Sequence, residues 1–176
     1  PAGWFNLGLT LLSLEEWKYA ANSFSEAITL ENGNAEFHYF RAQALRYAGE
    51  AEAANFDFDT AATLEPGNPL YFFTRANFKS DQGNLDGALE DYGTALKIHP
   101  NFVEAWYNRG QIHLRRKDYY PALRDLEKTA DLVPENIRFR LELAGVRATT
   151  LDFQGALKDY AKAIAATVSG DMEIVM

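Results

Sequence analysis

Residues 103–136 read VEAWYNRGQIHLRRKDYYPALRDLEKTADLVPEN, and the arrangement of small and large residues in this stretch recurs every 34 positions along the chain. The 176 residues divide into a remainder of six, 171–176, and five blocks in register: 1–34, 35–68, 69–102, 103–136 and 137–170. A period of about 20–50 residues is typical of proteins that stack copies of one structural unit. We therefore take the 34-residue block as the unit of the fold.

Two positions of the block hold only glycine or alanine. One contains Gly8, Ala42, Ala76, Gly110 and Ala144, and the other contains Ala20, Ala54, Ala88, Ala122 and Ala156. A position that is small in every block indicates that two helix backbones approach closely there, because a larger side chain would overpack the crossing. Two further positions are mostly large, and we expect them to fill the space between helices: Phe24, Phe58, Tyr92, Leu126, Tyr160, and Trp17, Ala51, Leu85, Tyr119, Phe153.

Each block has two helical halves. Apolar residues recur at helical spacing in both halves, Gly49, Gly83 and Asp118 separate the halves, and Pro66 and Pro134 follow second halves. We predict first helices near residues 2–14, 36–48, 70–82, 104–116 and 138–150, second helices near 18–31, 52–64, 86–98, 120–132 and 154–167, and no strand. The predicted fold class is all-α, an α-solenoid of five helix-turn-helix hairpins.

Composition excludes several classes of protein. The chain has no cysteine, which excludes disulfides and thiolate chemistry, and no apolar run long enough to cross a bilayer. Its net charge of −8 argues against nucleic acid as a partner, since phosphate binding needs a surplus of Lys and Arg. The first residue is not Met and no signal peptide is recognisable, so we expect a piece of a longer protein and make no prediction of its compartment.

Arginine and aspartate occupy two positions of the block that are 16 residues apart. Arg41, Arg75 and Arg109 fill one position, and Asp57, Asp91 and Asp125 fill the other. A guanidinium between packed helices needs a carboxylate partner, so we predict three ion pairs that fasten the two helices of a hairpin rather than bind a ligand. The fifth block departs from this pattern, because Asp159 is matched there with Leu143.

No set of residues predicts catalysis or metal binding. The three imidazoles, His38, His99 and His113, stand at three different positions of the block, with no acidic residue at a metal-binding offset. No phosphate-binding glycine loop and no combination of nucleophile and base is present. We predict a protein that is not an enzyme and that has no cofactor and no metal site.

The block resembles the tetratricopeptide repeat family. The resemblance covers residues 1–170 and is fullest in residues 103–136, where Trp106, Gly110, Ala122, Leu126 and Pro134 match the family pattern. It implies one right-handed solenoid domain over residues 1–170, with 171–176 as a loose tail or the start of a truncated helix. It also implies a scaffold for protein–protein interaction.

Four basic or imidazole residues depart from the family pattern. Lys79, His113 and Arg147 stand where the family usually has tyrosine, and Arg140 stands where Trp4 and Trp106 stand in their own blocks.

The resemblance also implies where a partner would bind. In family members the first helices line a concave groove, which places one mostly aromatic position per block there: Phe5, Tyr39, Phe73, Tyr107 and Leu141. Neighbouring amides on the same helix face could bind a peptide backbone. The predicted groove residues are Phe5, Asn6, Tyr39, Phe40, Gln43, Phe73, Asn77, Tyr107, Asn108, Gln111 and Arg138.

The charge pattern and one family motif refine the expected partner. The first two blocks have net charges of −3 and −4, whereas the fifth has +2, so we expect a protein or peptide with basic residues over repeats 1 and 2. Chaperone-binding members grip a C-terminal carboxylate with Lys, Asn and Arg. Here Asn77, Asn108 and Arg138 match in part, but Phe73 and Glu142 replace cations, which argues against that ligand.

Two other functions stay open from the sequence. One is self-assembly through the polar fifth repeat and the tail, because solenoid ends normally carry a polar cap and none is evident here. The other is a regulatory role within a larger enzyme or sensor.

Overall fold

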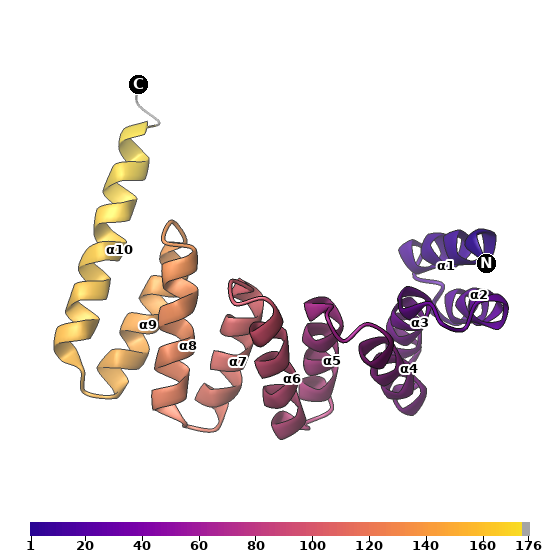
Figure 1. Cartoon of the computed structure of the whole chain (residues 1–176). Helices are drawn as coiled ribbons and strands as arrows, with labels where there is room; N and C mark the ends of the chain where they lie inside the picture. Colours follow the sequence, from indigo (N-terminus) through magenta and orange to yellow (C-terminus); the bar gives the residue numbers. More distant parts are fainter. Residues whose placement is uncertain (174–176) are drawn as a thin grey trace. The chain divides into compact units, whose positions relative to one another are not determined.

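The structure, a computed structural model, describes residues 1–173, with side chains described as far as Ala166. In this part of the chain all regular structure is α-helical and no strand occurs (Figure 1). The helices are α1 (Ala2–Ser13), α2 (Trp17–Leu30), α3 (Ala35–Ala48), α4 (Ala51–Leu64), α5 (Pro69–Asp81), α6 (Leu85–Ile98), α7 (Val103–Arg115), α8 (Tyr119–Leu132), α9 (Ile137–Thr149) and α10 (Phe153–Glu173). The prediction of an all-α fold of helical hairpins is confirmed.

Capping residues account for several of the helix ends. The side chains of Asn34 and Asn68 accept hydrogen bonds from the backbone N–H of Glu36 and Leu70, 3.0 and 3.1 Å away, and so begin α3 and α5. Gly49 ends α3 with a φ of +82°, a conformation that glycine adopts without strain. The predicted bounds agree with the observed ones to within two residues, except at the end of α10.

Helix α10 is longer than predicted. It has 21 residues and continues through Glu173, whereas the prediction ended it near residue 167. Val168 stands where earlier blocks have proline, so nothing in the sequence stops the helix there. Residues 171–173 of the predicted tail therefore continue α10, and 174–176 lie outside the described residues.

The chain forms two compact units. Unit 1 contains residues 1–99, with hairpins 1 to 3 (α1–α2, α3–α4 and α5–α6), and unit 2 contains residues 100–176, with hairpins 4 and 5 (α7–α8 and α9–α10). Within each unit the second helix of one hairpin packs on the first helix of the next. The single domain over residues 1–170 stays a prediction.

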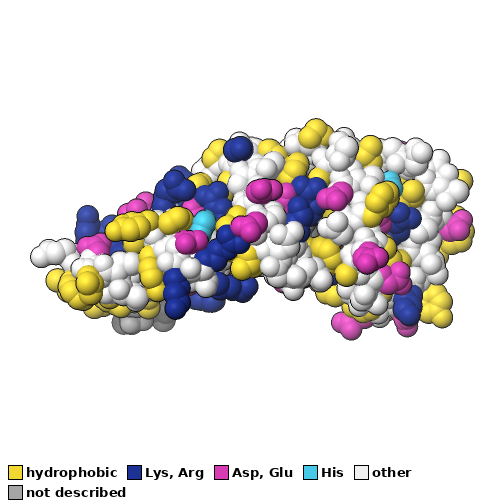
Figure 2. All heavy atoms as spheres, turned by 90° about the horizontal axis from the view of Figure 1, so that it is seen from below, with side chains coloured by type: hydrophobic (Ala, Val, Ile, Leu, Met, Phe, Trp, Pro, Cys, Tyr) yellow, Lys and Arg dark blue, Asp and Glu magenta, His cyan; other side chains and the backbone are white. Residues whose placement is uncertain are grey.

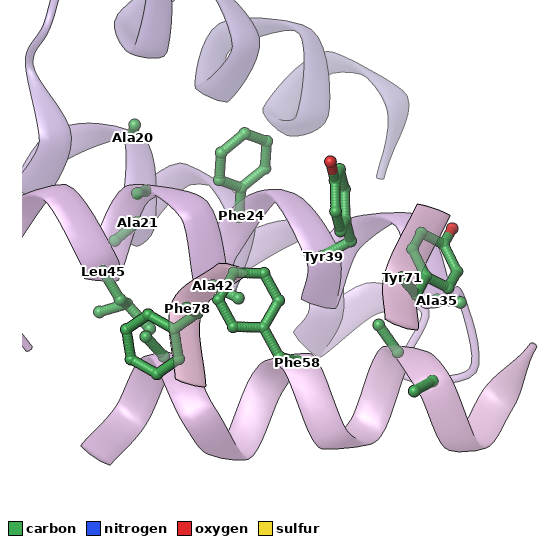
Figure 3. Close-up of a cluster of buried hydrophobic side chains, with 14 residues drawn as sticks. Ala20, Ala21, Phe24, Ala35, Tyr39, Ala42, Leu45, Phe58, Tyr71 and Phe78 are labelled. Atoms are coloured by element: carbon green, nitrogen blue, oxygen red, sulfur yellow. The ribbon is translucent and has the colours of Figure 1, made fainter. Parts of the chain in front are cut away.

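The small positions of the block lie where the two helices of a hairpin cross. Every alanine and glycine at these two positions is buried. A Cβ added to Gly8 would lie only 2.5 Å from the ring of Phe24, which shows how closely α1 approaches α2. In hairpin 2 the ring of Phe58 lies beside Ala42 in the same way (Figure 3). The close approach predicted from the sequence is confirmed.

The fifth hairpin departs from the predicted packing. Phe24, Phe58, Tyr92 and Leu126 are buried as expected, but Tyr160 at the same position is exposed. Phe153 was also expected to fill the space between helices and is exposed instead. Within the described residues, no following hairpin covers this side of α10.

The three predicted ion pairs are present. Each arginine donates from Nε and one Nη to both carboxylate oxygens, at 2.6 and 2.7 Å for Arg41–Asp57, 2.8 and 2.6 Å for Arg75–Asp91, and 2.7 and 2.8 Å for Arg109–Asp125. All three aspartates are buried. The bidentate geometry within each hairpin confirms the structural role predicted for these residues.

Each buried aspartate has a second basic neighbour on the same first helix. His38 Nδ1 lies 3.1 Å from Asp57, and Lys79 Nζ lies 2.8 Å from Asp91. His113 Nε2 lies 4.0 Å from Asp125. These neighbours are three or four residues from the paired arginine and therefore share its helix face.

Hairpin 5 keeps two cations at its aspartate although the usual arginine is Leu143. Arg140 and Arg147 reach Asp159 at 3.5 and 2.5 Å. The residues that depart from the family pattern thus replace or supplement the arginine, because a buried carboxylate without a cation would be costly.

Candidate interaction surface

The predicted groove residues divide between the two units. Those in unit 1 are Phe5, Asn6, Tyr39, Phe40, Gln43, Phe73 and Asn77, and those in unit 2 are Tyr107, Asn108, Gln111 and Arg138.

Phe5 and Phe40 join hairpins 1 and 2. Their ring centroids lie 5.5 Å apart, and the ring of Phe24 lies 5.8 Å from Phe5 and 6.0 Å from Phe40. Both are half-buried, whereas Asn6 is exposed. This end of the predicted surface therefore presents the partly exposed rings of Phe5 and Phe40 and the exposed amide of Asn6.

Tyr39 is a core residue rather than a surface residue. Its side chain is 7% exposed, and its ring packs against Phe40, Phe58 and Tyr71 (Figure 3). Its hydroxyl lies 3.4 Å from Thr74 Oγ1, and burial raises its pKa. Tyr39 therefore stabilises the contact between hairpins 2 and 3 and leaves little area for a ligand.

Gln43, Phe73 and Asn77 are half-buried and form the most accessible part of the predicted set in unit 1. Gln43 lies on α3, four residues after Tyr39 and so on the same helix face. Asn77 accepts a hydrogen bond from the hydroxyl of Tyr92, and the Phe73 ring lies 5.9 Å from the Tyr92 ring. Tyr92, on α6, thus contacts both side chains.

In unit 2, three predicted residues lie around Glu142, which the prediction did not include. Gln111 donates a hydrogen bond to the Glu142 carboxylate at 2.5 Å. Burial and the nearby Glu142 raise the pKa of the Tyr107 phenol, while Arg138 acts in the opposite direction. Asn108, also predicted, is half-buried on the same helix. The signal that could have identified Glu142 is its position in the repeat, which it shares with the predicted residues Asn6, Phe40 and Asn108.

Two acidic residues flank Tyr71 in unit 1. Burial, Glu65 and Glu36 together raise the pKa of the Tyr71 phenol to about 12. Both glutamates are exposed, at the end of α4 and the start of α3. We call Glu36 and Glu65 the acidic edge. The sequence predicts the net negative charge of repeat 2 but does not single out these two carboxylates.

The net charge of the chain belongs to unit 1. Residues 1–99 contain 14 Asp and Glu against 6 Lys and Arg, whereas residues 100–176 contain 11 of each. On the face shown in Figure 2, basic side chains gather mainly over unit 2. The acidic surplus of the chain is therefore confined to unit 1.

A hollow of about 520 Å³ lies elsewhere in unit 1, between α2 and α4. Lys18, Ser25 and Phe56 are among its lining residues, and its floor includes Arg41 and Asp57. This arginine and aspartate already pair with each other, so the other charged residues of the lining are Lys18 and Glu50.

The described residues contain no group of three or more His, Asp or Glu side chains placed to hold a metal ion. In the same part of the chain, no helix has both the length and the apolar character that crossing a membrane requires.

Two family models match the chain. Residues 80–116 match a model described as TPR repeat, and residues 103–136 match the tetratricopeptide repeat model. Comparison with curated protein sequences finds no significant match.

Solved structures similar to the chain include repeat proteins from bacteria. MamA from Desulfovibrio magneticus RS-1 is 20% identical with a TM-score of 0.78, over 96% of this chain and 95% of that one. A tetratricopeptide repeat protein from Parabacteroides merdae is 20% identical with a TM-score of 0.80, over 94% and 66%. YrrB, described as a TPR protein with an unusual peptide-binding site, is 18% identical with a TM-score of 0.73, over 93% and 84%. At these identities the likeness shows the fold alone.

Proposed function

The chain is built of tetratricopeptide repeats, a fold that serves as a protein-interaction scaffold, and from this premise we propose that it binds an extended basic segment of a partner protein on the first helices of unit 1. In this proposal the chain has no catalytic role. The binding surface consists of the exposed parts of α1, α3 and α5.

The observation that carries the proposal is a pair of accessible side chains on two first helices, Gln43 on α3 and Phe73 on α5. Both are half-buried, and the Phe73 ring lies 5.9 Å from the ring of Tyr92. An amide can both donate a hydrogen bond to a peptide backbone and accept one from it. A ring whose position is fixed gives contact area at a small entropic cost. Side chains of this kind suit a chain segment rather than a small molecule.

The charge of the partner follows from the acidic edge. Glu36 and Glu65 are exposed, in contrast to the buried aspartates. Both raise the pKa of the Tyr71 phenol, so a Lys or Arg of the partner placed beside Tyr71 would be attracted by both carboxylates. Such contacts are exposed, so their contribution is about 0.2–1 kcal/mol each and weakens with salt.

The test begins with a peptide selected from a random library displayed on phage, using residues 1–176 as the target. Its affinity is then measured by fluorescence anisotropy for the wild type, Gln43→Ala and Phe73→Ala. The matched control is Phe56→Ala, which removes an exposed aromatic ring from α4 instead of α5. Circular dichroism confirms that each variant is folded.

We expect the Gln43 and Phe73 variants to lose about tenfold or more in affinity, equivalent to about 1.4 kcal/mol, and the control to bind like the wild type. We also expect the selected peptides to be rich in Lys and Arg. The double variant Glu36→Lys, Glu65→Lys should bind these peptides more weakly than the double variant Glu26→Lys, Glu90→Lys, which changes second helices. Equal effects of Phe56→Ala and Phe73→Ala would contradict the proposed surface. Selection of acidic peptides would contradict the proposed charge of the partner.

A further inference from the structure

The hollow between α2 and α4 has the size of a small-molecule binding site. Its volume is about 520 Å³, and such sites usually have about 300–1,000 Å³. Its lining residues lie between residues 18 and 57, on α2, α3, α4 and the turn before α4, so its walls are complete within unit 1. Two of these residues set hairpins 1 and 2 apart from the other hairpins.

A small residue on α2 opens the hollow. Ala21 lines it and stands at a repeat position where α6 and α8 have Leu89 and Leu123. In unit 2, Leu123 packs on the cluster that contains Leu143 of the following helix, α9. Alanine is too short to fill the corresponding space between α2 and α3, so the hollow results from the residue at this position.

An exposed aromatic ring extends the apolar part of the lining. Phe56 lines the hollow from α4 and is 67% exposed. The other second helices have polar or charged residues at its repeat position: Asn22, Glu90, Arg124 and Lys158. Together with Leu45 on α3 and Ala53 on α4, this ring offers an apolar surface to the side chain of a ligand.

The charged residues of the lining form two groups. Arg41 and Asp57 pair with each other through two hydrogen bonds of 2.6 and 2.7 Å. Lys18 is the second residue of α2, Glu50 directly precedes α4, and both are exposed. Because helices joined by short turns run antiparallel, α2 and α4 run in the same direction and their first turns lie at the same end of the hollow. That end therefore has one cation and one carboxylate, which come from opposite walls.

We infer that the hollow binds a free α-amino acid with a large apolar side chain, such as phenylalanine. The side chain of the ligand lies between Ala21 and the Phe56 ring, its α-carboxylate meets Lys18, and its α-ammonium group meets Glu50. This site does not involve Gln43 or Phe73, so its success or failure is independent of the proposed peptide surface.

A zwitterion fits this lining better than an ion with a single charge. The lining has two cations and two carboxylates, so its net charge is zero. A simple carboxylate beside Lys18 would also approach Glu50 and be repelled by it, and a simple amine beside Glu50 would be repelled by Lys18. An α-amino acid has its ammonium and carboxylate groups on the same carbon atom and can contact both residues.

The experiment is an NMR titration of isotope-labelled residues 1–176 with L-phenylalanine, followed through the backbone amide shifts. A ligand of about twelve heavy atoms that binds with ordinary efficiency has a dissociation constant of about 1 mM, so the titration extends to about 20 mM. Three further probes each lack a feature of the zwitterion. Phenylpropionate lacks the ammonium group, phenethylamine lacks the carboxylate, and N-acetylphenylalaninamide lacks both charges and resembles a residue within a partner's chain.

Three variants locate the binding. Phe56→Ser removes the ring from the lining, and Ala53→Leu fills part of the hollow. Both positions are exposed, so neither change disturbs the core. Tyr19→Ser is the matched control, because it removes a ring that is 65% exposed on α2 and is not among the lining residues.

We expect L-phenylalanine to shift the amides around Ala21, Leu45 and Phe56. Its affinity should fall about fivefold or more in Phe56→Ser and Ala53→Leu and stay unchanged in Tyr19→Ser. Each of the three further probes should bind about threefold or more weakly than L-phenylalanine.

Two results would overturn the inference. One is the absence of amide shifts around the hollow at about 20 mM L-phenylalanine. The other is a probe without one or both charges that binds as tightly as L-phenylalanine. If that probe is N-acetylphenylalaninamide, the hollow takes a side chain of a partner protein instead of a free amino acid.

Discussion

Replacing Asp125 by serine and Arg109 by leucine, singly and together, tests whether the buried ion pairs act as units. The native chain contains this exchange already, because hairpin 1 has Leu7 and Ser23 at the two corresponding positions. The double variant therefore gives hairpin 4 a pair of residues that the same fold accommodates in hairpin 1.

The expected magnitudes follow from burial. Asp125 is 0% exposed and the Arg109 side chain 15%, and the two are joined by two short hydrogen bonds. Removing one partner leaves the other charge largely out of water, which costs about 3–5 kcal/mol, with Asp125→Ser at the lower end because Arg109 retains some exposure. Removing both leaves no stranded charge, so we expect the double variant to cost less than about 2 kcal/mol.

The assay is urea unfolding of all four proteins, monitored by far-UV circular dichroism and by Trp106 fluorescence in a background with Trp4→Phe and Trp17→Phe. Trp106 lies in the same hairpin and reports on it locally, which is useful because repeat arrays do not always unfold in one step. We expect a coupling energy of at least about 2 kcal/mol. Additive effects, with a coupling below about 0.5 kcal/mol, would show that Arg109 and Asp125 do not act as a unit.

Three further predictions concern other charges and a turn. Burial alone would raise the pKa of Asp57, but hydrogen bonds from Arg41 and His38 outweigh burial and lower the pKa. Stability is therefore lost as the pH falls below about 4. The urea midpoint of Asp57→Asn should fall less between neutral and acid pH than that of the wild type. His113→Lys should raise the free energy of unfolding in urea by about 0.5–1 kcal/mol at pH 7, since Lys79 makes the equivalent contact in hairpin 3, and a lower value would contradict this. Gly49→Ala should lower the free energy of unfolding by about 1 kcal/mol because of its positive φ, and so lower the thermal midpoint, whereas Gly67→Ala, at a glycine without positive φ, should not.

The sequence predicts the hairpins well because each depends on local patterns that recur five times. Gly8 and its counterparts mark the helix crossings, and the offset between Arg41 and Asp57 identifies a contact within one hairpin. Both features depend only on spacing inside the block. They are therefore readable without knowledge of the neighbouring hairpins.

The surface is harder to predict because equivalent positions have different neighbours. Tyr39 and Phe73 share one position of the block, yet Tyr39 is buried by Tyr71 and Phe40 while Phe73 stays half-exposed. Each buried aspartate has a second basic partner, which stands at the repeat position of His38 in some hairpins and at that of Lys79 in others. The pattern of one block therefore does not predict the second partner in the next block. The extension of α10 depends on the missing proline at Val168, a signal that the sequence contains.

Hydrogen exchange on residues 1–176, with and without a library-selected peptide at saturation, is the most direct test of the proposed binding surface. We expect slower amide exchange in α1, α3 and α5, centred on the turns of helix that contain Gln43 and Phe73, and unchanged exchange in α2, α4 and α6. Protection concentrated in the second helices, around the hollow beside Phe56, would contradict it.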